Sequence, residues 1–212
     1  PGCRSGRSSG AGRSNDDNYR TTYEIFVSSF CDSNGDGTGD LNGIRSKLDY
    51  IEDLGFDAIW LTPVHPSATY HKYDVDDYYT IDPAFGTIEE YEALLKECHE
   101  KDIRVYMDLV LNHTSDGHAW FKAASDYLHE LPSGWEPDTS YCKYYDYYNF
   151  SREALEGYTH IEGTEWYYES RFWSEMPELN LSSDAVRSEI RDIMTFWIGK
   201  GVDGFRLDAV MS

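Results

Sequence analysis

The sequence predicts an α/β fold built on a parallel sheet, and two observations carry that prediction. Short β-type segments alternate along the chain with segments of helical periodicity, and no two neighbouring strands are separated by a hairpin turn signal. Strands joined through helices pair in parallel, because each helix carries the chain back to the start of the next strand. The 212 residues are enough to bury a sizeable core.

The expected elements follow one another in regular order. Each strand is a short apolar run, and each helix carries an apolar face, with stop signals such as Gly55. The expected strands are Tyr23–Phe30, Ala58–Leu61, Arg104–Val110 and Val202–Val210. The expected helices are Ile44–Leu54, Ile88–Lys101 and Asp184–Lys200.

A long stretch interrupts this alternation after the third strand. It is dense in aromatic residues and has no clean period, and an insertion of roughly 70 residues predicts a small subdomain of its own. The first residues are rich in Gly, Ser and Arg and predict a disordered lead. We therefore divide the chain into the lead at 1–20, strand and helix segments at 21–110 and 182–212, and the inserted subdomain at 111–181.

The composition narrows the class of partner. A net charge of −21 argues against nucleic acid and anionic membranes, because both require a basic surface. Aromatic residues make up 16% of the chain and suit neutral carbohydrate, although packing in the core is the commoner role of any single ring. No stretch is long and apolar enough for a transmembrane helix. The four cysteines are too far apart for a zinc-type spacing, and their disulfide state stays open.

The last expected strand carries two charged residues on one face. Side chains alternate in a strand, so Arg206 and Asp208 share the face opposite to Phe205 and Leu207. A neighbouring guanidinium favours the ionised form of a carboxyl group, and a shielded carboxylate is a candidate nucleophile. A buried structural ion pair would give the same pattern, so this strand alone leaves both interpretations open.

A second group of polar residues follows the third expected strand. Asp108 lies within the strand, and Asn112 and His113 come directly after it. Parallel α/β folds place their active sites at the carboxyl ends of the strands. We therefore expect the polar groups of the two strands to converge there.

These segments resemble the signature segments of the α-amylase family, glycoside hydrolase family 13. DLVLNHT at 108–114 and GFRLDAV at 204–210 carry the resemblance. Three further segments agree with it in the family's order, namely GFDAIWLTPV at 55–64, YHKYDVDDYYTIDPAFGT at 70–87 and MPELN at 176–180.

The resemblance covers residues 23–212 and has consequences for the fold. It implies the first half, with four strands, of a (β/α)8 TIM barrel, into which a subdomain called B is inserted after the third strand. A complete barrel of this kind needs about 250 residues. We therefore expect the chain to be a fragment that stops after the fourth strand.

The resemblance also implies a retaining glycosidase mechanism and assigns roles to individual residues. Such enzymes use two carboxyl groups about 5–5.5 Å apart, one as nucleophile and one as acid/base. Asp208 is implied to be the nucleophile and Arg206 to hold it ionised, while Tyr73, His113 and Asp108 are implied to form the sugar site. The family's acid/base Glu lies on a fifth strand, so we expect it to be absent from this chain and the chain alone to be inactive.

An acidic loop after the first strand is a candidate metal site. It alternates oxygen-bearing residues with small ones, like the first part of an EF-hand loop, but lacks the Glu that closes an EF-hand. The loop resembles a calcium-binding loop of oligo-1,6-glucosidase-like members of the family. That resemblance implies Ca²⁺ as the cofactor, held by Asp32, Asn34, Asp36 and Asp40 through side chains and by Thr38 through its backbone oxygen. An ordinary acidic turn is the alternative.

The resemblance leads to one functional expectation with several alternatives. We expect an enzyme that hydrolyses α-1,4-linked glucan, such as starch or maltooligosaccharides, and that is monomeric and extracellular or attached to the cell surface. Cys3 is a candidate lipid attachment site. The alternatives are an oligo-1,6-glucosidase, a glucosyl transferase and a non-catalytic glycan-binding relative.

Overall fold

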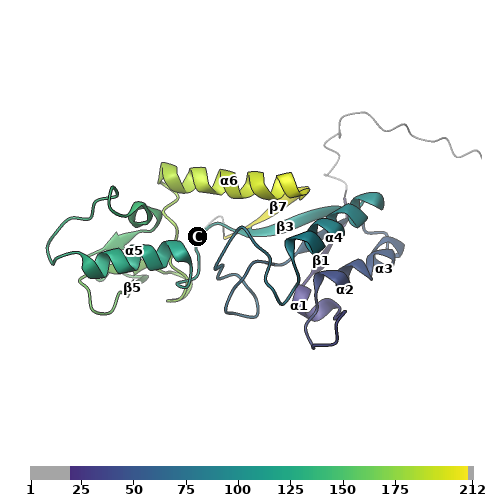
Figure 1. Ribbon diagram of the computed structural model, residues 1–212, viewed down its shortest axis with the longest axis horizontal. Helices are drawn as coiled ribbons and strands as arrows, with labels where there is room; N and C mark the ends of the chain where they lie inside the picture. The colour runs from purple at the N-terminus through teal and green to yellow at the C-terminus, as the bar shows by residue number, and fades with distance from the viewer. Residues whose placement is uncertain (1–19, 210–212) are drawn as a thin grey trace, which may run out of the picture.

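The computed structural model describes residues 20–209 and contains a four-stranded parallel sheet (Figure 1). Nearly all of the expected lead, including Cys3, lies outside the described residues, as does Val210. The sheet has the order β1-β2-β3-β7. Its strands are β1 (Thr22–Ile25), β2 (Ala58–Leu61), β3 (Arg104–Val110) and β7 (Gly204–Asp208). The predicted parallel α/β fold is thereby confirmed.

Helices cover one face of this sheet. Alternate side chains of β2 and β3, among them Ile59, Val105 and Met107, are buried in one core with the apolar faces of the helices. The opposite face carries Trp60 and Asp108. The helices of this layer are α1 (Val27–Phe30), α2 (Leu41–Arg45), α3 (Leu48–Asp53), α4 (Ile88–Glu100) and α6 (Asp184–Lys200).

The first strand is shorter than expected, because the chain turns at Phe26 into α1. The acidic loop closes directly on this turn: the Gly39 amide donates to Ser28 O at 2.8 Å. A Cβ at Gly39 would come within 2.1 Å of Val27 O, so this close approach requires glycine. The expected strand Tyr23–Phe30 is therefore wrong beyond Ile25.

The expected helix Ile44–Leu54 is two helices, α2 and α3. Asp40 caps α2, since its carboxylate accepts from the Gly43 amide at 2.7 Å, and this starts the helix earlier than expected. The hydroxyl of Ser46 donates to Gly43 O at 2.7 Å and so competes with the helical backbone bonds. The chain breaks there before α3 begins.

The inserted segment forms a second unit with its own small core. It contains a three-stranded antiparallel sheet in the order β4-β6-β5. A helix, α5, packs against this sheet, although the sequence analysis found no clean period there; its apolar residues Phe121, Ala124 and Leu128 share one face. The elements are α5 (Ala119–Glu130), the 3₁₀ turn η2 (Lys143–Tyr147), β4 (Phe150–Ser151), β5 (Tyr158–His160) and β6 (Tyr167–Glu169).

Candidate active site

The charged residues of β3 and β7 lie next to each other on the sheet face that the helices leave uncovered. Asp108 pairs in register with Arg206, and Val110 with Asp208. Because both strands run in parallel, Asp208 lies at the carboxyl end of the sheet. The structure therefore brings together the polar groups of two strands that are about a hundred residues apart in sequence.

Asp108 is fully buried and is surrounded by hydrogen-bond donors. Its Oδ2 accepts from the indole of Trp60 and the hydroxyl of Tyr73, each at 3.1 Å. Nη1 of Arg206 lies 3.2 Å from both of its oxygens. Burial raises the pKa of Asp108 to about 6, and Arg206, Tyr73 and Trp60 limit that rise by stabilising the carboxylate.

Arg206 joins the two carboxylates. The same Nη1 that contacts Asp108 also donates to Oδ1 of Asp208. The guanidinium lies over the ring of Trp60, 4.9 Å from its centroid, and 6.0 Å from the centroid of Tyr73. With 38% of its side chain exposed, Arg206 separates the buried Asp108 from Asp208, whose side chain is 21% exposed. Asp208 is thus the more exposed carboxylate of the two.

Tyr73 reaches this cluster from the loop between β2 and α4. The preceding residue, Lys72, has a left-handed backbone (φ 62°), which is uncommon for a residue with a side chain. Its ammonium forms a buried ion pair with Asp82 and lies 5.0 Å from the ring centroid of Phe85. These contacts hold the backbone in the conformation that directs the Tyr73 hydroxyl to Asp108.

The backbone around His113 is held by a chain of buried contacts. The Tyr78 hydroxyl lies 2.7 Å from Val110 O and 3.0 Å from His113 O. Trp197 of α6 in turn donates to Tyr78 O at 2.7 Å. The end of β3 is therefore fixed by aromatic residues from two distant parts of the chain.

The imidazole of His113 is buried but has a free ring nitrogen. Only 2% of the residue is exposed, and its Nε2 has no hydrogen-bond partner among the described residues. Phe172, from the inserted unit, lies over the ring at 5.3 Å between centroids. Burial lowers the pKa of His113, while the charge of Asp208 opposes that shift. The unsatisfied nitrogen is itself buried, so the ring as placed does not present it to solvent.

The MPELN segment lies beside the residues that follow β3. Leu179 donates its amide to Asn112 O at 2.8 Å, and Thr114 donates to Pro177 O at 3.1 Å. His113 and Glu178 form an isolated antiparallel bridge. Two segments that were singled out separately in the sequence are thus paired at the edge of the site.

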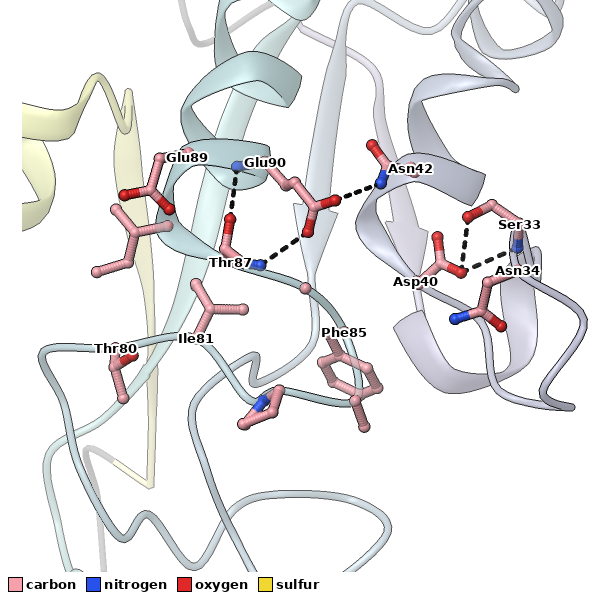
Figure 2. A pocket seen from close by; sticks show the side chains of 14 residues that line it. Ser33, Asn34, Asp40, Asn42, Thr80, Ile81, Phe85, Thr87, Glu89 and Glu90 are labelled. Atoms are coloured by element: carbon pink, nitrogen blue, oxygen red, sulfur yellow. Dashed lines mark hydrogen bonds between the residues drawn. The ribbon is translucent and has the colours of Figure 1, made fainter.

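The acidic loop lies apart from this cluster and borders an open hollow of about 590 Å³ (Figure 2). The other walls come from the loop before α4 and from the first turn of that helix. Figure 2 shows Glu90 accepting from Thr87 and Asn42, which completes a capping box at the start of α4. Neither Asp108 nor Asp208 lines this hollow.

The expected calcium ligands are occupied by the loop itself. Asp32 accepts from the amides of Gly35 and Gly37, and these bonds lower its pKa. Asn34 and Asp36 accept from the amides of Asp36 and Thr38. Asp40 faces Ser33 and the start of α2 (Figure 2). Within residues 20–209 no three acidic, His or Cys side chains are gathered into one cluster. The expected set also includes the amide oxygen of Asn34 and the backbone oxygen of Thr38, so calcium binding by this loop stays a prediction.

Trp60 is the site residue that the sequence analysis missed. It lies on β2 in register with Tyr106 of β3, on the same face as Asp108. The signal that could have found it is its position in the strand, since its neighbours Ile59 and Leu61 face the core. An indole on the uncovered face beside a buried carboxylate is a natural donor to it.

No helix within residues 20–209 has the length and apolarity that crossing a membrane requires.

The family model "Alpha amylase, catalytic domain" matches residues 24–212. Alpha-amylase 3 of Dictyoglomus thermophilum is 48% identical over 190 residues, which are 88% of this chain and 36% of the relative. Oligo-1,6-glucosidase of Bacillus cereus is 42% identical over 203 residues, 89% of this chain and 34% of the relative.

Solved structures agree with these sequence relatives. Eubacterium rectale Amy13B superposes with a TM-score of 0.90 at 57% identity, over 92% of this chain and 38% of that one. The alpha-amylase from H. orenii gives a TM-score of 0.76 at 40% identity, over 91% of this chain and 40% of that one. The chain spans about a third of the length of the curated relatives it matches. It belongs to the α-amylase catalytic-domain family, glycoside hydrolase family 13, and forms part of that family's (β/α)8 barrel.

Proposed function

We propose that this chain carries the nucleophile side of a retaining glycoside hydrolase that acts on α-1,4-linked glucan. The observation that carries the proposal is the placement of Arg206 between a buried carboxylate, Asp108, and an accessible one, Asp208. The guanidinium donates a charge-assisted hydrogen bond to the outer carboxylate and so holds it in place, and a carboxylate is a group that can attack an anomeric carbon.

The residues around Asp208 suit a sugar ring. The Tyr73 ring borders the cluster and offers a flat apolar face to the face of a pyranose. His113 carries a buried ring nitrogen with no hydrogen-bond partner among the described residues, and in this proposal a sugar hydroxyl satisfies it once the ring is uncovered. In this proposal Asp208 forms a bond to the anomeric carbon as the glycosidic oxygen departs, and a second carboxyl group protonates that oxygen.

Neither Asp108 nor Glu165 is placed to be the second carboxyl group. Asp108 is committed to Trp60, Tyr73 and Arg206 and is fully buried, so it does not protonate a leaving group. Glu165 lies in the inserted unit, where it pairs with Arg152. We therefore propose that residues 1–212 alone bind glucan but do not hydrolyse it, because catalytic carboxyl groups act as a unit.

The preference for α-1,4 linkages has support from relatives named as alpha-amylases. Relatives named as oligo-1,6-glucosidase and trehalose-6-phosphate hydrolase keep other linkages as alternatives. We place the α-1,4 linkage first because the relative with 48% identity is named as an alpha-amylase.

The test is to assay the protein that carries this chain on soluble starch, maltotetraose and isomaltose, and to follow the first-formed product by proton NMR. We expect cleavage of the first two substrates with release of the α-anomer, and at least a ~10³-fold loss of rate in Asp208→Asn. Cleavage of isomaltose alone would replace the linkage assignment. Release of the β-anomer, or unchanged activity in Asp208→Asn, would refute the mechanism.

A further inference from the structure

The inserted unit carries an exposed aromatic hollow that the active-site residues do not border. It lies at the end of α5, in the loop of residues 131–142, and has a volume of about 540 Å³, within the roughly 300–1,000 Å³ of small-molecule sites. In Figure 1 this loop follows α5 at the end of the molecule away from the four-stranded sheet. Trp135 and Tyr141 line it and are 65% and 83% exposed. Because both rings line the same hollow, they form one apolar patch, and contiguous patches of this kind mark interaction sites.

The loop that presents these rings is firmly held. Arg152 donates to the backbone oxygen of Trp135 and, at 2.5 Å, to the carboxylate of Glu136. Glu165 accepts from the Gly134 amide at 2.9 Å and also pairs with Arg152. The backbone of Trp135 is therefore fixed while its ring faces solvent, an arrangement that lowers the entropic cost of binding.

The other end of the loop is held in the same way. Asp138 donates its amide to the Tyr127 hydroxyl at 2.8 Å, which ties the loop to α5. The amide of Tyr141 donates to Asp138 O at 3.0 Å. Cys142 places its thiol 3.5 Å from Ala123 O. Tyr141 thus projects from an anchored turn rather than from a free segment.

The polar groups of the hollow select the kind of ligand. The carboxylates of Glu130, Glu136 and Asp138 line it and no Lys or Arg does, although Glu136 is paired with Arg152 beside the hollow. Carboxylates accept hydrogen bonds from hydroxyl groups and repel anions, so phosphorylated or acidic ligands are disfavoured. Aromatic faces beside such acceptors fit a neutral ligand with apolar faces and many hydroxyls, which describes a polysaccharide chain.

The surface continues beyond this hollow. A neighbouring hollow of about 420 Å³ shares Tyr127, Glu130 and Tyr141 with it and extends along α5 to Tyr144. The two hollows together are lined by the rings of Tyr127, Trp135, Tyr141 and Tyr144. This surface is suited to a chain of several units.

We propose that Trp135 and Tyr141 form a surface binding site for glucan chains, separate from the active site around Asp208. The choice of an α-glucan among polysaccharides rests on the proposed function. The site would hold the polymer near the enzyme while the active site cleaves it, which raises the local concentration of substrate.

The experiment measures binding without hydrolysis. Asp208→Asn serves as the background, and its affinity for amylopectin, cellulose and xylan is measured by electrophoresis in gels that contain each polymer. Trp135→Ala and Tyr141→Ala are each expected to weaken amylopectin binding by about ten-fold. Tyr50→Ala, which removes an exposed ring from α3 in the other unit, is the matched control and should bind as the background does.

The outcomes separate this site from the proposed function. Both rings are exposed, so the variants should keep the melting temperature of the parent. Unchanged amylopectin binding in both variants would overturn the proposal. A dimer of the parent protein in sedimentation that Trp135→Ala abolishes would also overturn it, because the rings would then bind a second copy of the chain. Binding of cellulose or xylan through the same rings would keep the site but contradict the α-glucan function.

Discussion

One guanidinium nitrogen of Arg206 lies 3.2 Å from each carboxylate oxygen of Asp108, its register partner on the neighbouring strand. This contact is what gives the buried carboxyl group a counter-charge. Without it, only the hydrogen bonds from Tyr73 and Trp60 would oppose burial, which raises the pKa of Asp108 to about 6 even with Arg206 in place. The protonation state of the buried Asp108 therefore depends on Arg206, a partly exposed side chain.

Replacing Arg206 by Met should raise the pKa of Asp108 above about 6 and destabilise the protein. A carboxyl group with a raised pKa in the folded state favours the protonated form, so its contribution to stability falls as the pH rises from about 4 through that pKa. In Arg206→Met the fall should extend to higher pH. The expected loss near neutral pH is about 2 kcal/mol, below the roughly 3–5 kcal/mol of fully buried pairs because Arg206 is 38% exposed.

Urea unfolding between pH 4 and pH 8 measures this effect. Arg191→Met on the exposed face of α6 is the matched control, and its stability should follow the parent at every pH. If the difference in unfolding free energy between Arg206→Met and the parent does not change with pH, Arg206 does not set the pKa of Asp108.

Asp203 should be a major electrostatic contributor to stability. It joins β7 to its neighbours by accepting from His99 at 2.7 Å and from Arg104 and the Val105 amide, each at 2.9 Å. These bonds lower its pKa even though burial opposes them. Asp203→Asn should cost about 3 kcal/mol near neutral pH.

The pH dependence gives this prediction its sign. A carboxyl group with a lowered pKa stabilises the fold above its unfolded value, near 3.8, and loses that effect as the pH falls through the folded value. The difference in unfolding free energy between the parent and Asp203→Asn should therefore shrink as the pH falls into the acid range. The control is Asp53→Asn, which changes an exposed carboxylate at the end of α3. In urea unfolding from pH 3 to pH 7, its unfolding free energy should stay close to that of the parent.

Thr87→Ala should weaken the start of α4. The Thr87 hydroxyl accepts from the Glu90 amide at 3.2 Å, one half of the capping box. Loss of such a cap costs about 1 kcal/mol. Thr195 is exposed and lies in the middle of α6, and Thr195→Ala should leave the free energy of unfolding unchanged or slightly higher. Equal losses in the two variants would deny the cap any special role.

Calcium binding by the acidic loop stays a prediction, and thermal unfolding in calcium or in EDTA tests it. If the loop rearranges around the ion, calcium should raise the melting temperature of the parent, and Asp36→Asn should remove that increase. Asp40→Ala should lower the melting temperature in EDTA as well, because Asp40 caps α2. No response to millimolar calcium would make the loop an ordinary acidic turn.

The sequence predicted the regular elements where one physical signal dominated. Ala58–Leu61, Arg104–Val110 and Asp184–Lys200 have the expected bounds, because apolar pattern and stop signals agree there. The predicted end of the first strand was wrong because the loop at Gly39 packs on Val27 O, a tertiary contact that no local sequence pattern indicates. The sequence analysis did not indicate that Asp40 caps α2, and its predicted role as a calcium ligand stays a prediction.

The candidate site was predicted in part. The motif residues Tyr73, Asp108 and Arg206 are brought together, yet the sequence did not indicate that Arg206 contacts both carboxylates. Trp60 escaped because its role depends on strand register, which no single segment determines. The covering of His113 by Phe172 likewise depends on how the inserted unit folds back.

The bonds that pair the end of β3 with the MPELN segment are made by backbone atoms, from Leu179 to Asn112 and from Thr114 to Pro177. Backbone bonds impose few demands on side-chain identity. Much of the inserted unit can therefore diverge in sequence without moving the imidazole of His113. Over evolutionary time, this would let the surface of the inserted unit change while the cluster of Asp108, Arg206 and Asp208 keeps its shape.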